Sequence, residues 1–214
     1  MRLLRRLSTP TAAILLTLAG AAAPIRAAGA DEALSLVPPG ATSVGVIRLD
    51  SLRSSPLAAR LFAETDDLTV DGDAARFLEE TGLRPKQDVD VVVVAGLHSN
   101  RVNAPEDGLV IFEGRFDPAR IEAALQSRGA VRKSTPEGDY MLVSERHGDG
   151  DHAAISILSD RIVVAGNPAA VTRALADRRS GGSGFLRGEG LGRQIDRVPA
   201  DASAWAIVDA TRAP

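Results

Sequence analysis

The chain of 214 residues contains no cysteine. It therefore has no disulfide, no thiol nucleophile and no cysteine-ligated zinc. A lipoprotein anchor is excluded as well, because that modification needs a cysteine at the cleavage site. An oxidising compartment permits disulfides but does not require them, and a domain of this size can be held together by its apolar core alone.

Aromatic residues and net charge are also low. One Trp, one Tyr and five Phe weaken the case for binding of carbohydrate or single-stranded nucleic acid, since both use aromatic platforms. Residues 1–30 hold four arginines, so the remainder has 21 basic and 28 acidic side chains. This acidic balance argues against nucleic acid or an anionic membrane as the partner.

The first thirty residues have the pattern of a secretory signal peptide. Arg2, Arg5 and Arg6 precede an apolar stretch over 7–25. Ala28-Gly29-Ala30 offers small residues for cleavage after Ala30, with Ala23 or Ala27 as the alternative positions. An uncleaved anchor is the alternative, but the apolar run 12–23 is shorter than the roughly 20 residues of a spanning helix. The prediction is an exported protein, periplasmic or extracellular, with no membrane span after cleavage.

The remaining chain alternates between strand and helix patterns. We expect an α+β fold in which four or so helices pack on a mostly antiparallel sheet of about seven strands. The continuous apolar run of 89–97 predicts an interior strand. The predicted strands are 43–50, 89–97, 109–116, 131–134, 140–145, 153–158, 161–165 and 203–209. One predicted helix begins at residue 55, and the other predicted helices are 74–81, 118–128, 168–179 and 191–197.

Two patterns occur twice. Phe116-Asp117-Pro118 and Gly166-Asn167-Pro168 each join a strand to a helix through a capping side chain and a proline, although any capped helix can use this chemistry. The opening segment from Val37-Pro38 to Asp50 is echoed from Val198-Pro199 to Asp209. We therefore expect a domain over 31–197, with 198–214 as the start of a possible second repeat that is apparently truncated.

The order of these features resembles a family of exported bacterial proteins known only as a domain of unknown function. The resemblance rests on the Val37-Pro38 opening and its Asp50, on Phe77-Leu78 with Gly82-Leu83, on 88–90, on 114–118 and on 164–169. It implies the fold and no activity. Similar proteins tend to continue beyond the equivalent of Asp209, so the resemblance implies a truncated product or a short variant.

The best candidate for chemistry is the segment 145–152. His147, Asp149, Asp151 and His152 supply nitrogen and oxygen ligands for a divalent metal. Their spacing fits no established metal motif. The alternative is a solvated hairpin tip, in which Asp and Gly provide the turn.

Other motifs are absent or incomplete. The glycines of 181–192 follow a predicted helix, whereas a phosphate-binding loop lies between a strand and a helix, and no Gly-x-Ser-x-Gly occurs. No cofactor is predicted. The leading hypothesis is a non-enzymatic module of the cell envelope or periplasm that binds an unknown protein partner. A metal-dependent binder or enzyme and a small-ligand carrier are the alternatives, and the oligomeric state is left open.

Overall fold

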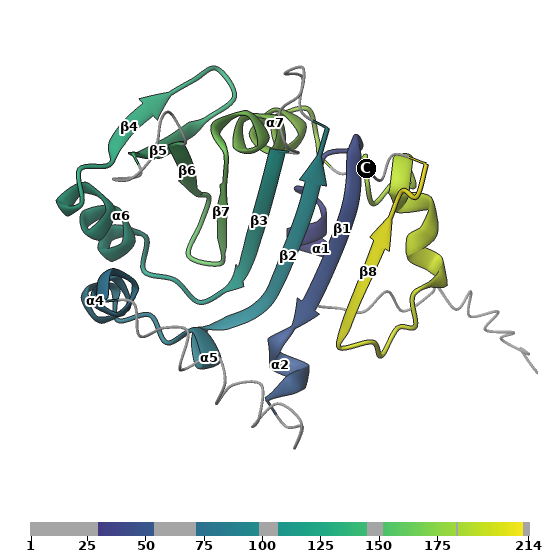
Figure 1. Ribbon diagram of the computed structural model, residues 1–214, viewed down its shortest axis with the longest axis horizontal. Helices are drawn as coiled ribbons and strands as arrows, with labels where there is room; N and C mark the ends of the chain where they lie inside the picture. The colour runs from purple at the N-terminus through teal and green to yellow at the C-terminus, as the bar shows by residue number, and fades with distance from the viewer. Residues whose placement is uncertain (1–29, 54–71, 99–106, 145–151, 183, 212–214) are drawn as a thin grey trace, which may run out of the picture.

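The computed structural model describes residues 30–53, 72–98, 107–144, 152–182 and 184–211. These residues form an α+β fold around one eight-stranded antiparallel sheet with the order β4-β5-β6-β7-β3-β2-β1-β8 (Figure 1). The predicted fold class is confirmed: about seven strands were expected, the sheet has eight, and each predicted strand range overlaps one of them. Residues 1–29 of the predicted signal peptide lie outside the described residues. The start of the helix predicted from residue 55 lies outside them as well.

The chain builds the sheet from its interior to its two edges. β1, β2 and β3 are consecutive neighbours, the chain then crosses to β4 at one edge and returns through β5 and β6 to β7 beside β3, and β8 closes the other edge by pairing with β1. The strands are β1 Ala41–Arg48, β2 Val89–Leu97, β3 Asp107–Gly114, β4 Val131–Ser134, β5 Asp139–Ser144, β6 His152–Ile157, β7 Ile162–Gly166 and β8 Ala204–Val208.

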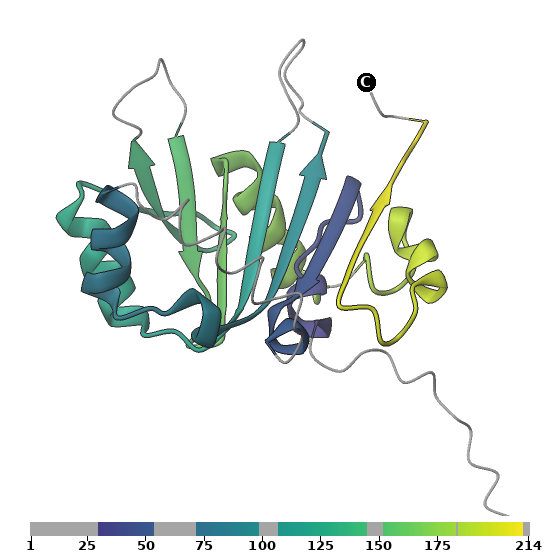
Figure 2. The same cartoon turned by 60° about the horizontal axis from the view of Figure 1, so that its bottom comes forward.

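Helices lie on both faces of the sheet but over different strands (Figures 1 and 2). On one face, α1, α7 and the 3-10 helix η1 pack against the main core cluster. On the other face, α4 and α6 lie beside β5, β6 and β7. The helices are α1 Asp31–Leu34, α2 Leu49–Leu52, α4 Gly72–Thr81, α5 Pro85–Asp88, α6 Pro118–Ser127, α7 Pro168–Arg179 and η1 Gly190–Arg197.

The two Asx-Pro segments form capped helix starts, as predicted. The Asp117 side chain accepts a hydrogen bond from the Arg120 N–H at 3.1 Å, and Asn167 accepts one from the Ala170 N–H at 2.9 Å. Each oxygen satisfies a backbone donor that has no partner inside its helix. Gly129 follows α6 with a φ of 82°, a left-handed conformation that glycine adopts without steric cost.

The core lies mainly between the sheet and the α1, α7 and η1 layer. Val93, Leu109 and Val171 are fully buried there. Phe185, which lies within the glycine-rich segment 181–192, is also fully buried in this cluster. The segment after α7 is therefore anchored to the core, and η1 and β8 follow directly from this anchor.

Candidate interaction surface

The predicted metal loop lies almost entirely outside the described residues. His147, Asp149 and Asp151 fall in the segment 145–151, which joins β5 to its antiparallel neighbour β6. His152 begins β6, is exposed and lies opposite Ser144 in the register. Among the described residues, no group of three or more His, Asp or Glu side chains could hold a metal ion. The metal site stays a prediction.

One half of the sheet carries apolar side chains on a face that the described helices leave uncovered. The register places Ile47 of β1 between Val92 of β2 and Ala204 of β8, and Gly45 between Val94 and Ala206. Residues opposite one another in a register share a face. We call this surface the open face: Ser43, Gly45, Ile47, Val92, Val94, Ala204, Ala206 and Val208.

The open face is uncharged and accessible. Ile47 is 42% exposed, Val94 48% and Val208 59%, whereas Val46 and Val93, on the other face of the same strands, are 1% exposed or less. In Figure 1 the front of β1, β2 and β8 is free of α4 and α6, which lie over the opposite half of the sheet. The valines of β2 thus point both into the core and out onto the open face.

β8 has one unpaired backbone edge in the described structure. Ser203 accepts a hydrogen bond from the Arg48 N–H at 2.8 Å, and the Asp209 N–H donates to the Thr42 carbonyl at 2.8 Å. In an antiparallel ladder the bonded residues alternate, so the odd-numbered residues of β8 turn their backbone groups to β1. The N–H and C=O groups of Ala204, Ala206 and Val208 consequently point to the free edge.

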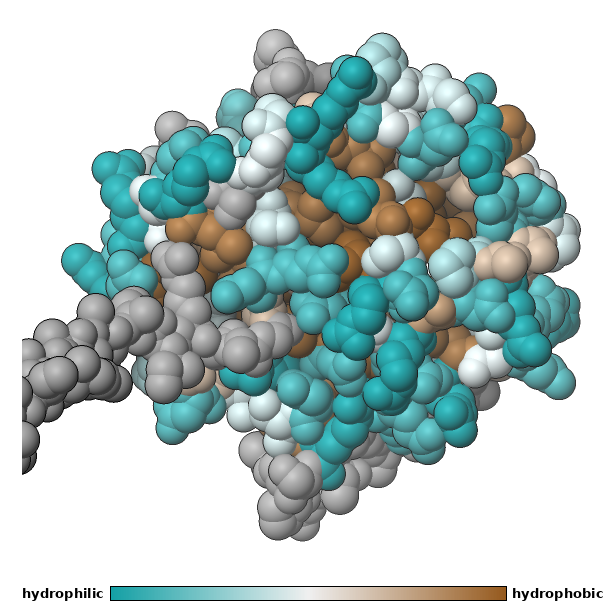
Figure 3. Space-filling view, turned by 180° about the vertical axis from the view of Figure 1, so that it is seen from behind, coloured by the Kyte–Doolittle hydropathy of each residue, from teal (hydrophilic) through white to brown (hydrophobic). Residues whose placement is uncertain are grey.

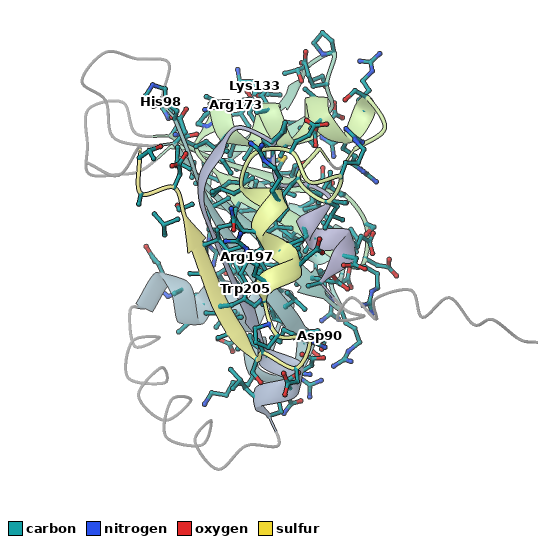
Figure 4. All side chains as sticks on the ribbon, turned by 90° about the vertical axis from the view of Figure 1, so that its right-hand side faces the viewer. Asp90, His98, Lys133, Arg173, Arg197 and Trp205 are labelled. Carbon is teal, nitrogen blue, oxygen red and sulfur yellow. The ribbon has the colours of Figure 1, made fainter. Side chains whose placement is uncertain are left out.

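A groove runs between this edge and η1. Its open volume is about 520 Å³, and it is lined from η1 and the segment after it by Leu191, Gln194, Arg197, Val198 and Pro199, and from β8 and its end by 205–210. Figure 4 shows Arg197 and Trp205 close together on this side of the molecule. Trp205 is half-buried, because its ring also packs on the main core cluster.

The charges in the groove are unequally satisfied. The Asp209 carboxylate accepts hydrogen bonds from the Thr211 N–H at 3.0 Å and the Thr211 hydroxyl at 2.6 Å. Arg197 is exposed, and none of the ion pairs formed by the described residues includes it. The groove therefore presents the Arg197 guanidinium without an ion pair to a described residue, and an Asp209 carboxylate that is hydrogen-bonded by Thr211.

The opposite edge of the sheet has a different surface. All four residues of β4 are exposed, and two of them, Arg132 and Lys133, are basic. Arg132 forms ion pairs with Glu122 and, at 3.3 Å, with Asp139, and its hydrogen bond to Glu122 raises the pKa of the guanidinium. Charged side chains on a short strand hinder the pairing of another strand. β4 is protected in this way and β8 is not.

A second groove lies on the helix-covered face between β6 and α7. It is lined by Leu158 and Leu175 with Arg178, Arg179, Glu137 and Asp139 at its margin, and its open volume is about 550 Å³. Viewed from behind, this face shows apolar surface between polar side chains (Figure 3). Neither groove is the enclosed apolar cavity that a small-ligand carrier needs.

Two buried carboxyl groups were not identified from the sequence. Asp107 is 2% exposed, forms an ion pair with Arg173 and accepts a hydrogen bond from the Asn167 amide at 2.5 Å. Arg173 also donates to the His98 carbonyl at 3.0 Å, so this cluster ties α7 to β2 and β3. Because its members satisfy one another, the cluster has the character of a structural network.

Glu113 is the second buried carboxyl group, at 6% exposure on β3. Its Oε1 lies 3.5 Å from Arg161, and its Oε2 has no hydrogen-bond partner among the described residues. Burial raises the pKa of Glu113, and the charge of Glu32 adds to this, while a hydrogen bond from the Ala33 backbone and the charge of Arg161 act in the opposite direction. The signal in the sequence is a single acid directly after the apolar run 109–112.

Comparisons with known proteins do not place the chain in a family. No family model matches it, and neither a curated protein nor a solved structure is significantly similar. The resemblance to exported bacterial proteins stays a prediction. Within the described ranges, no helix is both long and apolar enough to cross a membrane.

Proposed function

We propose that the chain is a non-enzymatic module of the bacterial cell envelope or periplasm that acts by binding another protein. The observation that carries this proposal is the open face, which continues without interruption into the free edge of β8. Isolated exposed apolar residues are normal on soluble proteins. A connected apolar surface that includes three large side chains and a strand edge is typical of an interaction site.

The energetic argument is simple. Fully burying a Val or Ile side chain contributes about 1.5–3 kcal/mol, and Ile47, Val94 and Val208 are each about half exposed. A partner that covered all three would gain about 3 kcal/mol from these side chains alone. This gain is available to any apolar partner surface, because no charge on the open face opposes it.

The alternatives have less support. A metal-dependent binder or enzyme would use His147, Asp149, Asp151 and His152, and three of these residues lie outside the described part of the chain. A small-ligand carrier would need an enclosed cavity, whereas the two grooves described above are open.

The test is capture of the tagged full chain from a gently cross-linked envelope fraction of its host, read by mass spectrometry. Val94→Arg places a charge at the centre of the open face, and Val131→Arg is the matched control, because Val131 is 56% exposed on β4. We expect a stoichiometric partner with the unmodified chain and with Val131→Arg, and its loss with Val94→Arg. Recovery of the unmodified chain alone as a monomer would contradict the proposal.

The export part of the proposal has a separate measurement. After cell fractionation, we expect the protein in the periplasmic or extracellular fraction, with an intact mass that lacks residues 1–30. A full-length protein confined to the cytoplasmic fraction would contradict export. The capture experiment would still test whether the open face binds a protein.

A further inference from the structure

We propose that the groove between β8 and η1 binds an extended peptide segment of the partner, which pairs with β8 as a ninth strand of the sheet. This inference rests on the proposed function, because it names the mode of binding and the kind of segment that binds. The segment it requires has apolar side chains on both faces and one carboxylate that reaches Arg197.

The backbone of β8 provides the pairing groups. Ala204, Ala206 and Val208 direct three N–H and three C=O groups to the free edge, as the hydrogen bonds from Arg48 and Asp209 establish. Addition of a strand satisfies such groups by main-chain hydrogen bonds, whatever the sequence of the added strand. Edges of this kind are otherwise protected by charge, proline or a covering element.

The two faces of the added strand meet different surroundings. Side chains on the groove side lie beside Trp205 and Ile207 and face Leu191 on η1. Side chains on the other side continue the open face beside Ala204 and Ala206, which are small. Because neighbouring strands lie about 4.8 Å apart, larger apolar residues on the added strand can cover these alanines and the adjoining edge of the open face.

Charge gives the segment its specificity. Arg197 lines the groove without an ion pair to any described carboxylate, and the Asp209 carboxylate is engaged by Thr211. A carboxylate on the groove side of the added strand would pair with Arg197. A basic residue beside Arg197 would meet a like charge.

A second copy of the chain fits this edge less well than a single strand. In Figures 1 and 2, η1 lies beyond β8, on the outer side of the sheet edge. Two-fold pairing of β8 with its copy would bring both η1 helices to the same side of the joined sheet at the junction, where they would compete for the same space. Pairing of β8 with the β4 of another copy would place Arg132 and Lys133 at the new ladder.

The direct test uses a defined probe on the full chain. The probe is an acetylated and amidated ten-residue peptide with two Ser residues at each end and six central residues that are all Val except for one Asp, so that both faces of the strand carry apolar side chains. Trp205 is the only tryptophan of the chain and lines the groove, so its fluorescence reports binding. We expect saturable binding, and a probe with Asn in place of Asp is expected to bind about fivefold more weakly.

Two further probes test strand pairing without changing the protein. One carries N-methyl groups on the backbone nitrogens of its odd-numbered residues, and the other carries them on those of its even-numbered residues. An added strand turns only one of these sets of N–H groups to β8, so one probe is expected to bind like the parent and the other to lose at least tenfold in affinity. Equal binding by the two N-methylated probes would overturn the proposal.

Protein variants locate the site. Ala206→Pro removes an outward N–H, and proline is tolerated where the N–H of an edge strand faces solvent, so we expect loss of probe binding with an unchanged circular dichroism spectrum. Arg197→Gln is expected to make the Asp and Asn probes bind equally. Arg193→Gln, on the exposed side of η1, is the matched control and is expected to keep their fivefold difference. If Arg197→Gln also kept it, the charge assignment would be overturned.

The outcomes separate this inference from the proposed function. If the envelope partner were lost with Val94→Arg but retained at full level by a folded Ala206→Pro variant, the proposed function would stand and strand addition would be refuted. Sedimentation of the unmodified chain as a dimer that Ala206→Pro converts to a monomer would identify the occupant as a second copy, and would also refute the proposal. Absence of any partner would refute the proposed function, whereas the probes test the groove independently.

Discussion

The two capped helix starts allow a quantitative test of the buried Asp107 network. Asp117 and Asn167 occupy the same position before a proline, and each accepts one hydrogen bond from a backbone N–H of its helix. Their second interactions differ, since Asp117 forms an exposed ion pair with Arg120 at 3.4 Å, whereas the Asn167 amide donates to the buried Asp107 at 2.5 Å. Matching substitutions at the two positions therefore separate the cap from the network.

At each position, alanine removes both the helix cap and the second side-chain interaction, whereas serine keeps a capping oxygen and removes only the second interaction. Loss of an N-cap costs about 1 kcal/mol, so Asp117→Ala is expected to lower the free energy of unfolding by this amount. Asn167→Ala also removes a bond to a buried charge, worth about 1.5–3 kcal/mol, for a total of about 3–4 kcal/mol. Because Ser retains a capping oxygen, Asp117→Ser is expected to be nearly neutral, whereas Asn167→Ser loses about 2 kcal/mol.

The assay is urea unfolding of the purified full chain, followed by circular dichroism and by Trp205 fluorescence. Coincident transitions would justify a two-state analysis. If Asn167→Ser lowered the free energy of unfolding no more than Asp117→Ser, the Asn167 amide would contribute nothing to Asp107. The reasoning that assigns a structural role to this cluster would then be wrong, and Arg173 alone would satisfy the carboxylate.

Three further predictions concern the core. Because the pKa of Glu113 is raised, its proton stabilises the fold below the ordinary carboxyl pKa, and this stabilisation is lost as the pH rises through the raised pKa. The free energy of unfolding of Glu113→Gln, relative to that of the unmodified chain, should therefore be higher at pH 7 than at pH 4, as measured by urea unfolding at the two pH values. Phe185→Ala should lower the free energy of unfolding by about 3–5 kcal/mol, because the ring is fully buried. Gly114→Ala should reduce the melting temperature measured by calorimetry, since its added Cβ would lie 2.1 Å from the Asp88 carbonyl oxygen, whereas Gly40→Ala, with open space around it, should not.

Local patterns in the sequence were sufficient to predict most helices and strands. The bounds predicted for β2 and α7 agree with the structure, because a long apolar run and an Asn-Pro start are strong local signals. The single turn α5 is not among the predicted helices. Four residues that begin at Pro85 carry too little periodicity to indicate a helix.

Strand order and burial required the structure. Pairing of β8 with β1 joins segments about 160 residues apart in sequence, and no local feature specifies it. The run 89–97 correctly predicted an interior strand, but it did not show that Val92 and Val94 would lie on the face opposite the main core. Phe185 was equally hidden, since it lies within a glycine-rich segment that has the composition of a linker. The predicted metal ligands His147, Asp149 and Asp151 stay untested by the described residues.

The contrast between the two edges of the sheet is the strongest physical argument for a binding role. A strand edge with unpaired N–H and C=O groups attracts other strands, and charged side chains are a common protection. β4 has this protection in Arg132 and Lys133, whereas β8 has only apolar side chains, Ala-Trp-Ala-Ile-Val. On the same sheet, therefore, charged side chains on β4 oppose pairing at one edge, whereas no charged side chain on β8 opposes it at the other. An edge that binds a partner strand must lack charges that oppose pairing, and the lone Arg197 beside β8 lies where it can select a carboxylate without blocking the backbone.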